Sequence, residues 1–187
     1  GAPLPQGNLR RVGVLTIRMT THPLVFGTVG NPTQPFDRFV RWMDGQVGRR
    51  MKKSEVLIQV GTSKIRPTHC QWIDFIPMDE FVEMVGRAHV VVCHGGQGSI
   101  LTCLQSGKRP IIIPRLQKFD EHINDHQLEI VEEFSKRKLI DAVYQEPDLY
   151  PQVLGRLRTR GGYTYKPHNR LMLNLVGRIL SDLEKNL

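Results

Sequence analysis

The stretch His94-Gly95-Gly96-Gln97-Gly98-Ser99 follows the apolar run 89–93 and leads into a helical pattern at 99–105. A buried strand, a glycine-rich turn and a helix start together suit an anion, because glycine lets the backbone approach a ligand and the first-turn amides carry the positive end of the helix dipole. Neither the dinucleotide fingerprint Gly-x-Gly-x-x-Gly nor a Walker ending Gly-Lys-Ser/Thr occurs here. We therefore interpret the stretch as a phosphate cradle fronted by a histidine, which favours a nucleotide-sugar over a nucleotide triphosphate.

A simpler interpretation is that the glycines mark only a tight connection and that His94 is an ordinary turn histidine. A second polar segment argues against it. Residues 114–127 follow the next apolar strand, 110–113, and read Pro-Arg-Leu-Gln-Lys-Phe-Asp-Glu-His-Ile-Asn-Asp-His-Gln. In a parallel sheet both loops leave from the same carboxyl edge, where ligands bind. The sequence therefore predicts one polar site built from two loops.

Strand-like and helix-like runs alternate along most of the chain, which predicts a parallel sheet covered on both faces. The first helix has apolar residues at 3.6-residue spacing from Phe36 to Val47, with Pro35 in its first turn. Asp79 and Asp148 are the expected starts of two later helices. Strands are expected at residues 25–26, 55–60, 72–76, 89–93, 110–113 and 139–143. We predict an α/β protein: a single Rossmann-like domain with a mainly parallel sheet of about six strands and helices on both faces.

Residues 19–158 are expected to form this nucleotide-sugar-binding domain. Residues 1–18 contain no acidic residue and are expected to be an N-terminal extension or a segment added for expression. Residues 159–187 are expected to form a loop and a C-terminal helix, at about 168–183, which packs on the domain or on a partner.

The formal net charge is +8, with basic clusters at 49–53, 136–138 and 156–160. Such clusters serve nucleic acid, anionic lipid or pyrophosphate substrates, or are solvated helix faces. Aromatic residues do not interleave with them and no nucleic-acid-binding motif occurs, so no nucleic acid is expected as a partner. No apolar run approaches the roughly 20 residues that span a bilayer. Three cysteines, Cys70, Cys93 and Cys103, are expected to be buried free thiols of a reducing cytosol.

The two polar segments together resemble the C-terminal, donor-binding domain of family 28 glycosyltransferases, which have the GT-B fold. The resemblance is carried by Cys-His-Gly-Gly-x-Gly-Ser-Ile-Leu at 93–101, a strand ending at Pro114, and Asn-Asp-His-Gln at 124–127. It extends over residues 20–150 and is nearest to two small stand-alone forms of the domain. One is the PssE-type subunit of bacterial exopolysaccharide glucuronosyltransferases, whose start is similar to residues 25–40. The other is the cytosolic subunit of the eukaryotic enzyme that adds the second N-acetylglucosamine to dolichol pyrophosphate.

The motifs and the resemblance give a set of candidate donor-binding residues around the diphosphate, the ribose and the hexose. His94 is the candidate stabiliser of the departing diphosphate once its imidazole is protonated, and no other catalytic residue is assigned. Related domains usually carry an acidic residue near the position of Thr102, where threonine offers the ribose only one hydroxyl. The other candidates are Gly27, Thr28, Gly95, Gly96, Gly98, Ser99, Glu121, His122, Asn124, Asp125, His126 and Gln127.

Several of these residues have structural alternatives. Ser99 also suits a helix N-cap, and Asn124 with Gln127 resembles a capping box. His122 and His126, four residues apart, could bind a metal. The resemblance implies that the pyrophosphate needs none, so no metal or other cofactor is expected and the UDP-sugar is the substrate.

The clustered carboxylates Asp120, Glu121 and Asp125 could supply a general base, but the resemblance assigns the base to the other domain. It implies an inverting transferase subunit that moves a hexose from a UDP-sugar to a polyprenyl-pyrophosphate-linked sugar in exopolysaccharide or glycolipid synthesis. Glucuronate is the first expectation and N-acetylglucosamine the alternative. Thr102 leaves a third interpretation open, a non-catalytic nucleotide-sugar-binding module.

A membrane-anchored acceptor-binding subunit is the expected partner, because one Rossmann-like domain makes only half of a GT-B site. Little or no transfer is expected without it. Homodimerisation is a secondary expectation. The chain is accordingly expected in the cytoplasm, held at the cytoplasmic membrane through its partner.

Overall fold

The computed structural model describes residues 23–30, 33–124, 126–159, 177–178 and 181. The strands are β1 (Val25–Thr28), β2 (Val56–Gln59), β3 (Gln71–Ile73), β4 (Val90–His94), β5 (Ile111–Ile113) and β6 (Asp141–Ala142). The α-helices are α1 (Asp37–Trp42), α2 (Met78–Arg87), α3 (Gln97–Gln105), α4 (His126–Lys136) and α5 (Glu146–Arg158). Shorter turns are the π-helix η1 (Met43–Val47) and the 3-10 helices η2 (Gly48–Arg50), η3 (Lys53–Glu55) and η4 (Gln117–Phe119).

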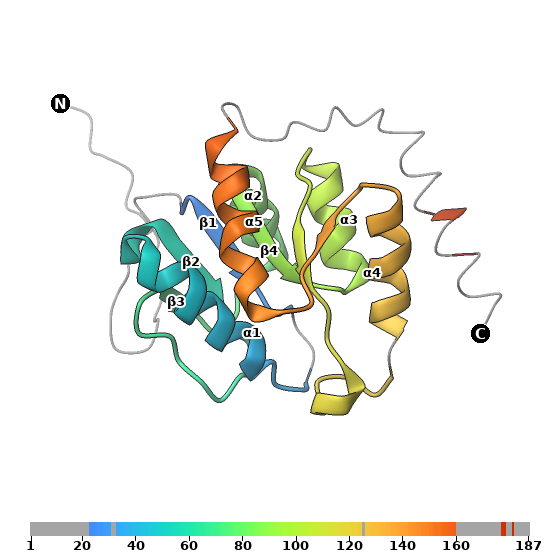
Figure 1. Cartoon of the computed structure of the whole chain (residues 1–187), viewed down its shortest axis with the longest axis horizontal. Coiled ribbons are helices and arrows are strands. Elements are labelled where there is room, and N and C mark those ends of the chain that lie inside the picture. Colours follow the sequence, from blue (N-terminus) through green and yellow to red (C-terminus); the bar gives the residue numbers. More distant parts are fainter. Residues whose placement is uncertain (1–22, 31–32, 125, 160–176, 179–180, 182–187) are drawn as a thin grey trace.

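All five strand pairings are parallel, and the strands lie in the order β3-β2-β1-β4-β5-β6 (Figure 1). The central strand β1 places Val25 opposite Val56 of β2 and Val90 of β4. The strand order reverses between β1 and β4. Doubly wound sheets bind their ligands outside the carboxyl ends of the strands at such a switch point. The predicted six-stranded Rossmann-like α/β fold is therefore confirmed, and it directs attention to the ends of β1 and β4.

Helices cover both faces of the sheet because the strands alternate their side chains between two apolar cores. Phe26 and Val91 belong to the core beneath α2, α3 and α4. Val25 and Val92, their neighbours in the chain, belong to the core beneath α1, η1 and α5. Burying each such side chain stabilises the fold by roughly 1.5–3 kcal/mol. Because the strands are buried on both faces, nearly every residue in them is apolar.

Helix starts differ from the sequence expectations by one to three residues. Asp79 is not a cap, because α2 begins at Met78 with Pro77 in the N-cap position. Asp148 likewise lies within α5, whose N-cap is Gln145. Both carboxylates lie in the first turn, where their negative charge interacts favourably with the positive end of the helix dipole, but neither caps an amide. Pro35 precedes α1 rather than lying in its first turn, since the N-cap there is Phe36.

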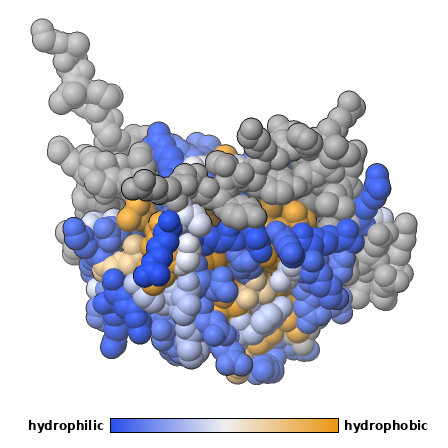
Figure 2. Space-filling model, turned by 45° about the horizontal axis from the view of Figure 1, so that its top comes forward, coloured by the Kyte–Doolittle hydropathy of each residue, from blue (hydrophilic) through white to orange (hydrophobic). Residues whose placement is uncertain are grey.

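The remaining expectations for the ends of the chain lie mostly outside the described residues. Gly177, Arg178 and Ser181 are helical, but the rest of the predicted helix 168–183 and all of residues 1–18 are not described. None of the described helices has the length and hydropathy needed to cross a membrane. All three cysteines are buried and free, as expected. On the face shown in Figure 2, the described residues form a mostly hydrophilic surface that is interrupted by hydrophobic patches.

Candidate functional site

The start of α3 leaves its backbone amides open to a ligand. Gly96 is the N-cap residue, so no side chain caps the helix, and the first helical bond runs from the Ile100 amide to the Gly96 carbonyl at 3.1 Å. The amides of the first turn have no acceptor within an α-helix. A side chain added at Gly98 would meet nothing within 4 Å, so this turn faces open space. Ser99 is the third residue of α3 rather than its cap, which leaves its hydroxyl beside the same turn.

His94 ends β4 with its ring held between two glycines. The residue is 7% exposed. A Cβ atom added to Gly30 would lie 2.2 Å from His94 Cε1, and one added to Gly96 would lie 2.3 Å from Nε2. Gly30 also has a φ of 74°, which disfavours any other residue. The imidazole therefore lies at the switch point, between the turn after β1 and the start of α3.

The buried position of His94 changes its expected charge. Burial, helped by the nearby charges of Arg115 and His122, lowers the pKa of His94 to about 3. The imidazole is therefore neutral at pH 7 in the ligand-free domain, and its protonation beside a departing diphosphate stays a prediction. Nδ1 is buried without a hydrogen-bond partner among the described residues. A neutral ring can still donate one N–H to an anion.

We expect His94 to make the domain sensitive to acid. An unfolded chain takes up a proton at this residue near pH 6.5, while the folded ring resists protonation until about pH 3. The unfolded state then binds more protons, so the free energy of unfolding should fall as the pH drops from 6.5 toward 3, by up to about 1.4 kcal/mol per pH unit. We would measure the free energy of unfolding by urea denaturation at several pH values between 7 and 5. This free energy should change less with pH in His94→Gln than in the wild type. An equal change with pH in the two proteins would contradict the assignment.

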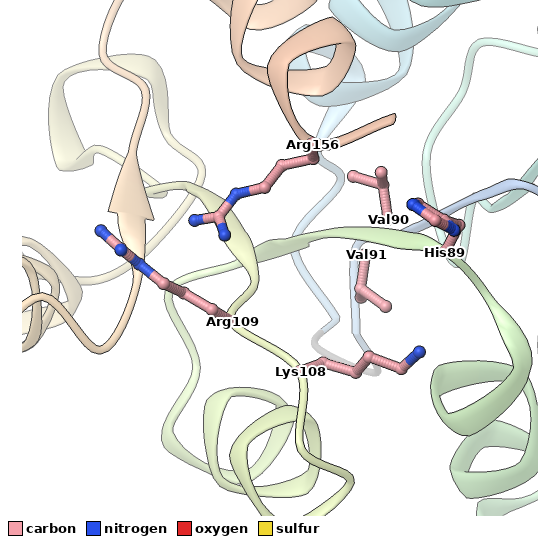
Figure 3. Close-up of a pocket in the computed structure, with 6 residues that line it drawn as sticks. All are labelled: His89, Val90, Val91, Lys108, Arg109 and Arg156. Atoms are coloured by element: carbon pink, nitrogen blue, oxygen red, sulfur yellow. The ribbon is translucent and has the colours of Figure 1, made fainter. Parts of the chain in front are cut away.

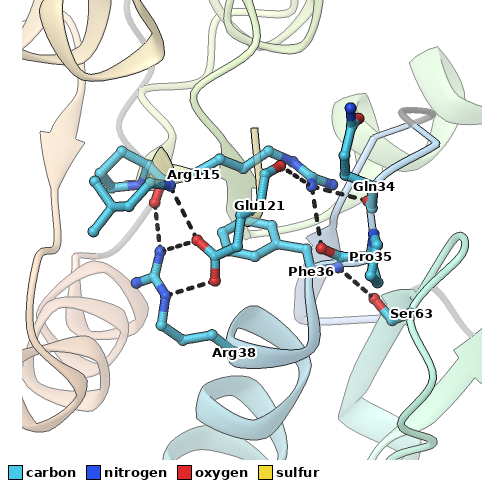
Figure 4. A network of polar contacts seen from close by, with 9 residues as sticks. Gln34, Pro35, Phe36, Arg38, Ser63, Arg115 and Glu121 are labelled. Carbon is cyan, nitrogen blue, oxygen red and sulfur yellow. Dashed lines mark hydrogen bonds and ion pairs between the residues drawn. The ribbon is translucent and has the colours of Figure 1, made fainter. Parts of the chain in front are cut away.

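Arg115 follows β5 and holds the surrounding loops from inside (Figure 4). The residue is 1% exposed, and burial lowers its pKa to about 10, so it stays charged at neutral pH. Its acceptors are backbone carbonyls: Nη1 donates to Gln34, Pro35 and Glu121 at 3.0, 3.5 and 2.9 Å, and Nη2 donates to Val29 at 3.0 Å. One buried cation therefore joins the loop after β1 to the loop after β5.

Glu121 lies in the loop after β5 and is already engaged within the protein. The residue is 4% exposed. Its carboxylate accepts two hydrogen bonds from Arg38 of α1, at 2.9 and 2.7 Å, and one from the Leu116 amide at 3.0 Å. These bonds leave the Glu121 side chain poorly placed to bind a donor, and they also disfavour it as a general base.

The second polar segment lies against the cradle. A Cβ atom added to Gly95 would lie 3.4 Å from Gln127 Cβ, so the start of α4 packs on the glycine turn. Gln127 is 9% exposed, and its Oε1 is buried without a hydrogen-bond partner among the described residues. His122 Nδ1 lies 3.0 Å from Asn124 Oδ1. The structure thus brings His94, Gly95, His122 and Gln127 together, as two loops at one edge predict.

Other candidates are placed less favourably. Gly27 lies within β1, and an added Cβ atom would lie 3.0 Å from Met43 Cε in the core beneath α1. Thr28 is fully buried, and its hydroxyl donates to Gln59 Oε1 at 2.9 Å and accepts the Gly30 amide at 3.0 Å. Both residues shape the turn that carries Gly30, and this position does not favour direct contact with a donor.

Thr102 faces the same side of α3 as Gly98, but its hydroxyl donates to the Gly98 carbonyl at 2.9 Å. Its predicted ribose contact would have to replace that bond. Asp125 and the side chain of His126 lie outside the described residues, so their predicted roles and the capping box stay predictions. Among the side chains that are described, no group of three metal-binding residues comes together.

A small pocket lies at the opposite edge of the sheet, near the amino ends of β4 and β5 (Figure 3). It is lined by His89, Val90, Val91, Lys108, Arg109 and Arg156. Arg109 and Arg156 both bond to Asp141, and Lys108 Nζ donates to the Ala88 carbonyl at 2.8 Å. These cations already have partners within the fold, whereas His89 Nε2 is buried without a hydrogen-bond partner among the described residues. The cradle remains the better candidate for a ligand because its orphaned atoms lie beside an uncapped helix start.

Sequence reasoning assigned no role to Arg115 or Arg38. A charged residue directly after Pro114, at the carboxyl end of a predicted strand, was an available signal for Arg115. Arg38 gave none, because its carboxylate partner lies 83 residues away in the chain.

Residues 24–163 match the model of the glycosyltransferase family 28 C-terminal domain. The UDP-N-acetylglucosamine transferase subunit ALG13 of Yarrowia lipolytica (strain CLIB 122 / E 150) is 40% identical over 63 residues, which are 33% of this chain and 30% of that relative. The match therefore spans less than a third of the relative's length.

Solved structures are similar in fold. An NMR structure of ALG13 superposes with a TM-score of 0.54 at 17% identity, covering 83% of this chain and 95% of that one. The glycosyltransferase SnogD from Streptomyces nogalater superposes with a TM-score of 0.52 at 14% identity, covering 98% of this chain but 44% of its own. The glycosyltransferase of kitacinnamycin superposes with a TM-score of 0.52 at 16% identity, covering 93% of this chain and 43% of its own. This chain thus spans less than half the length of the latter two.

Proposed function

The chain belongs to the glycosyltransferase family 28 C-terminal domain family, and on that premise we propose that it is the UDP-sugar-binding subunit of an inverting glycosyltransferase. The diphosphate would lie at the uncapped start of α3, against Gly96, Gly98 and Ser99. The sugar would lie toward the loop that carries His122, Asn124 and Gln127.

One observation carries this proposal: two buried polar atoms flank the glycine turn and have no hydrogen-bond partner in the part of the chain that the structure describes. They are His94 Nδ1 and Gln127 Oε1. Buried polar groups in native proteins are nearly always hydrogen-bonded, so orphans beside an uncapped helix point to a ligand. The buried charge of Arg115 adds a positive potential that favours an anion at this edge.

The proposed chemistry is a displacement at the anomeric carbon of the sugar. An acceptor hydroxyl forms a bond to that carbon, the bond to the diphosphate oxygen breaks, and the acceptor proton passes to a base. The helix dipole and the neutral His94 imidazole, through its N–H, would stabilise the negative charge that develops on the UDP leaving group. We propose that the base comes from a second polypeptide, as the resemblance to the family implies; within this chain, the buried Glu121 is already engaged with Arg38.

Two features support a two-subunit enzyme. The relative from Yarrowia lipolytica is named as a subunit of a UDP-N-acetylglucosamine transferase. The two longer glycosyltransferases match this chain over 43% and 44% of their lengths, which leaves room for an acceptor-binding half. From the resemblance to stand-alone subunits of family 28, we further propose a membrane-anchored partner, a polyprenyl-pyrophosphate-linked acceptor and a cytoplasmic location for this chain. The relative favours N-acetylglucosamine as the sugar, while the similarity of residues 25–40 to PssE-type subunits favours glucuronate.

Calorimetric titration with UDP, UDP-N-acetylglucosamine and UDP-glucuronate tests the proposal. We expect saturable binding, and UDP at one hundred times its Kd should stabilise the fold by about 2.7 kcal/mol. ADP and inorganic phosphate at the same concentrations serve as controls for nonspecific anion binding. The absence of both heat and thermal stabilisation with all three uridine nucleotides would overturn the proposed donor site.

A further inference from the structure

We propose that the ion pair between Arg38 and Glu121 is a positioning clamp that fixes the sugar-facing loop on α1. This inference rests on the proposed donor site, because it concerns how one wall of that site is held. The two residues would touch no substrate atom and would act through the loop.

The pair has the geometry of a rigid connection. Arg38 Nε and Nη2 donate to the two oxygens of Glu121 at 2.9 and 2.7 Å, and Nη2 also donates to the Pro114 carbonyl at 2.7 Å. The side chains are 13% and 5% exposed. A bidentate pair shielded from water resists rearrangement far more than an exposed one. The start of α1 is thereby bonded to both ends of the segment 114–121.

Aromatic rings hold the guanidinium of Arg38 in place. Its Cζ lies 4.7 Å from the ring centre of Trp42 and 5.3 Å from that of Phe36, both on the α1 segment. It also lies 5.2 Å from the ring centre of Phe119, which belongs to η4 in the clamped loop. Arg38 is therefore stacked between the helix and the loop that it binds.

Glu121 passes this restraint on to the residues that follow it. Its side chain binds Arg38 and the Leu116 amide, while its carbonyl accepts a bond from Arg115. Because both the side chain and the carbonyl of Glu121 are held, the point from which the chain continues to His122 is fixed. The α3 cradle is a separate element, so loss of the clamp should weaken contacts to the sugar more than contacts to the diphosphate.

The first test compares UDP with UDP-sugar binding in Arg38→Gln and Glu121→Gln. We expect the ratio of the UDP-sugar Kd to the UDP Kd to rise about tenfold in both variants, because small displacements of positioning groups cost that much or more. Arg38→Lys keeps the charge but loses the paired N–H groups of the guanidinium. In this variant, the ratio of the two Kd values should lie between the wild-type value and that of Arg38→Gln. The double variant should resemble either single variant, since the two side chains act through each other.

Arg66→Gln is the matched control. Arg66 also pairs with a carboxylate, Asp74 at 2.8 Å, and also stacks on a tryptophan, Trp72 at 5.0 Å, but that pair is 40% and 49% exposed. In Arg66→Gln, the ratio of the UDP-sugar Kd to the UDP Kd should stay at the wild-type value. Unchanged ratios in the Arg38 and Glu121 variants would overturn the clamp.

The second test needs no ligand and so separates the clamp from the proposed function. Amide hydrogen exchange at residues 116–121 should be at least about tenfold faster in Arg38→Gln and Glu121→Gln, with exchange in β4 and α3 unchanged. Wild-type protein that binds no uridine nucleotide would overturn the donor site, yet the exchange rates would still decide whether the loop is clamped. If Arg38→Gln does not fold, both tests are made with Arg38→Lys. Amide exchange rates at residues 116–121 and a ratio of UDP-sugar Kd to UDP Kd that both equal the wild-type values in Arg38→Lys would then overturn the proposal.

Discussion

Replacing Gly98 with glutamate is expected to weaken UDP binding about a hundredfold while the domain stays folded. An added side chain at Gly98 meets nothing within 4 Å, whereas one at Gly96 would strike the His94 ring. A carboxylate at about 6 Å from a phosphate, at an effective dielectric constant near 20, costs about 3 kcal/mol, or about a hundredfold in Kd. The same carboxylate favours the start of a helix and replaces glycine with a better helix former. The melting temperature should therefore stay at the wild-type value, while calorimetry should give a Kd for UDP that is about a hundredfold higher.

Gly155→Glu is the control for this variant. Gly155 lies within α5, and an added side chain there also meets nothing within 4 Å. It introduces the same charge into a helix away from the cradle, so UDP should bind with wild-type affinity. Wild-type affinity in Gly98→Glu would show that the start of α3 does not bind the diphosphate.

Replacing Arg115 with methionine is expected to cause the largest loss of stability. Methionine has similar length and fills the apolar part of the site, but it donates no hydrogen bond. Two buried carbonyls and two partly buried ones, in the loops after β1 and β5, would lose their donor. Each unsatisfied buried group costs about 1–3 kcal/mol, and partial rearrangement reduces the sum, so a loss on the order of 3–5 kcal/mol is expected. That is a large share of the roughly 5–15 kcal/mol that stabilises an ordinary domain.

Urea denaturation measures this loss, with Arg66→Met as the matched control. Arg66 lies in an exposed pair with Asp74 and also donates to the partly buried Ser63 carbonyl, so its replacement should lower the free energy of unfolding by no more than about 1 kcal/mol. A loss below about 1 kcal/mol in Arg115→Met would contradict the role of Arg115 in joining the loops.

The strand runs and the two polar segments were readable from the sequence because their signals are local. Parallel strands buried on both faces are continuously apolar, as in 90–93 and 111–113, and each ends in a turn with its own residue pattern. Parallel pairing then requires both turns to emerge at one edge, which is why the glycine turn and Gln127 were expected together, and the start of α4 indeed packs on Gly95. Helix starts were less predictable, since the polar residues chosen as caps at Asp79, Asp148 and Ser99 lie inside the first turn.

The charge of His94 and the roles of Arg115 and Arg38 were decided only by the tertiary structure. A histidine in a glycine turn could be protonated or neutral, and burial between Gly30 and Gly96 beside the cation of Arg115 makes it neutral. The hydrogen bonds of Arg115 and Arg38 join residues that lie up to 86 and 83 positions away in the chain. Periodicity and turn chemistry act over a few residues, so they determined the sheet and the cradle. Burial and pairing between distant segments depend on how the loops pack, and they decided which polar residues remain available to a ligand.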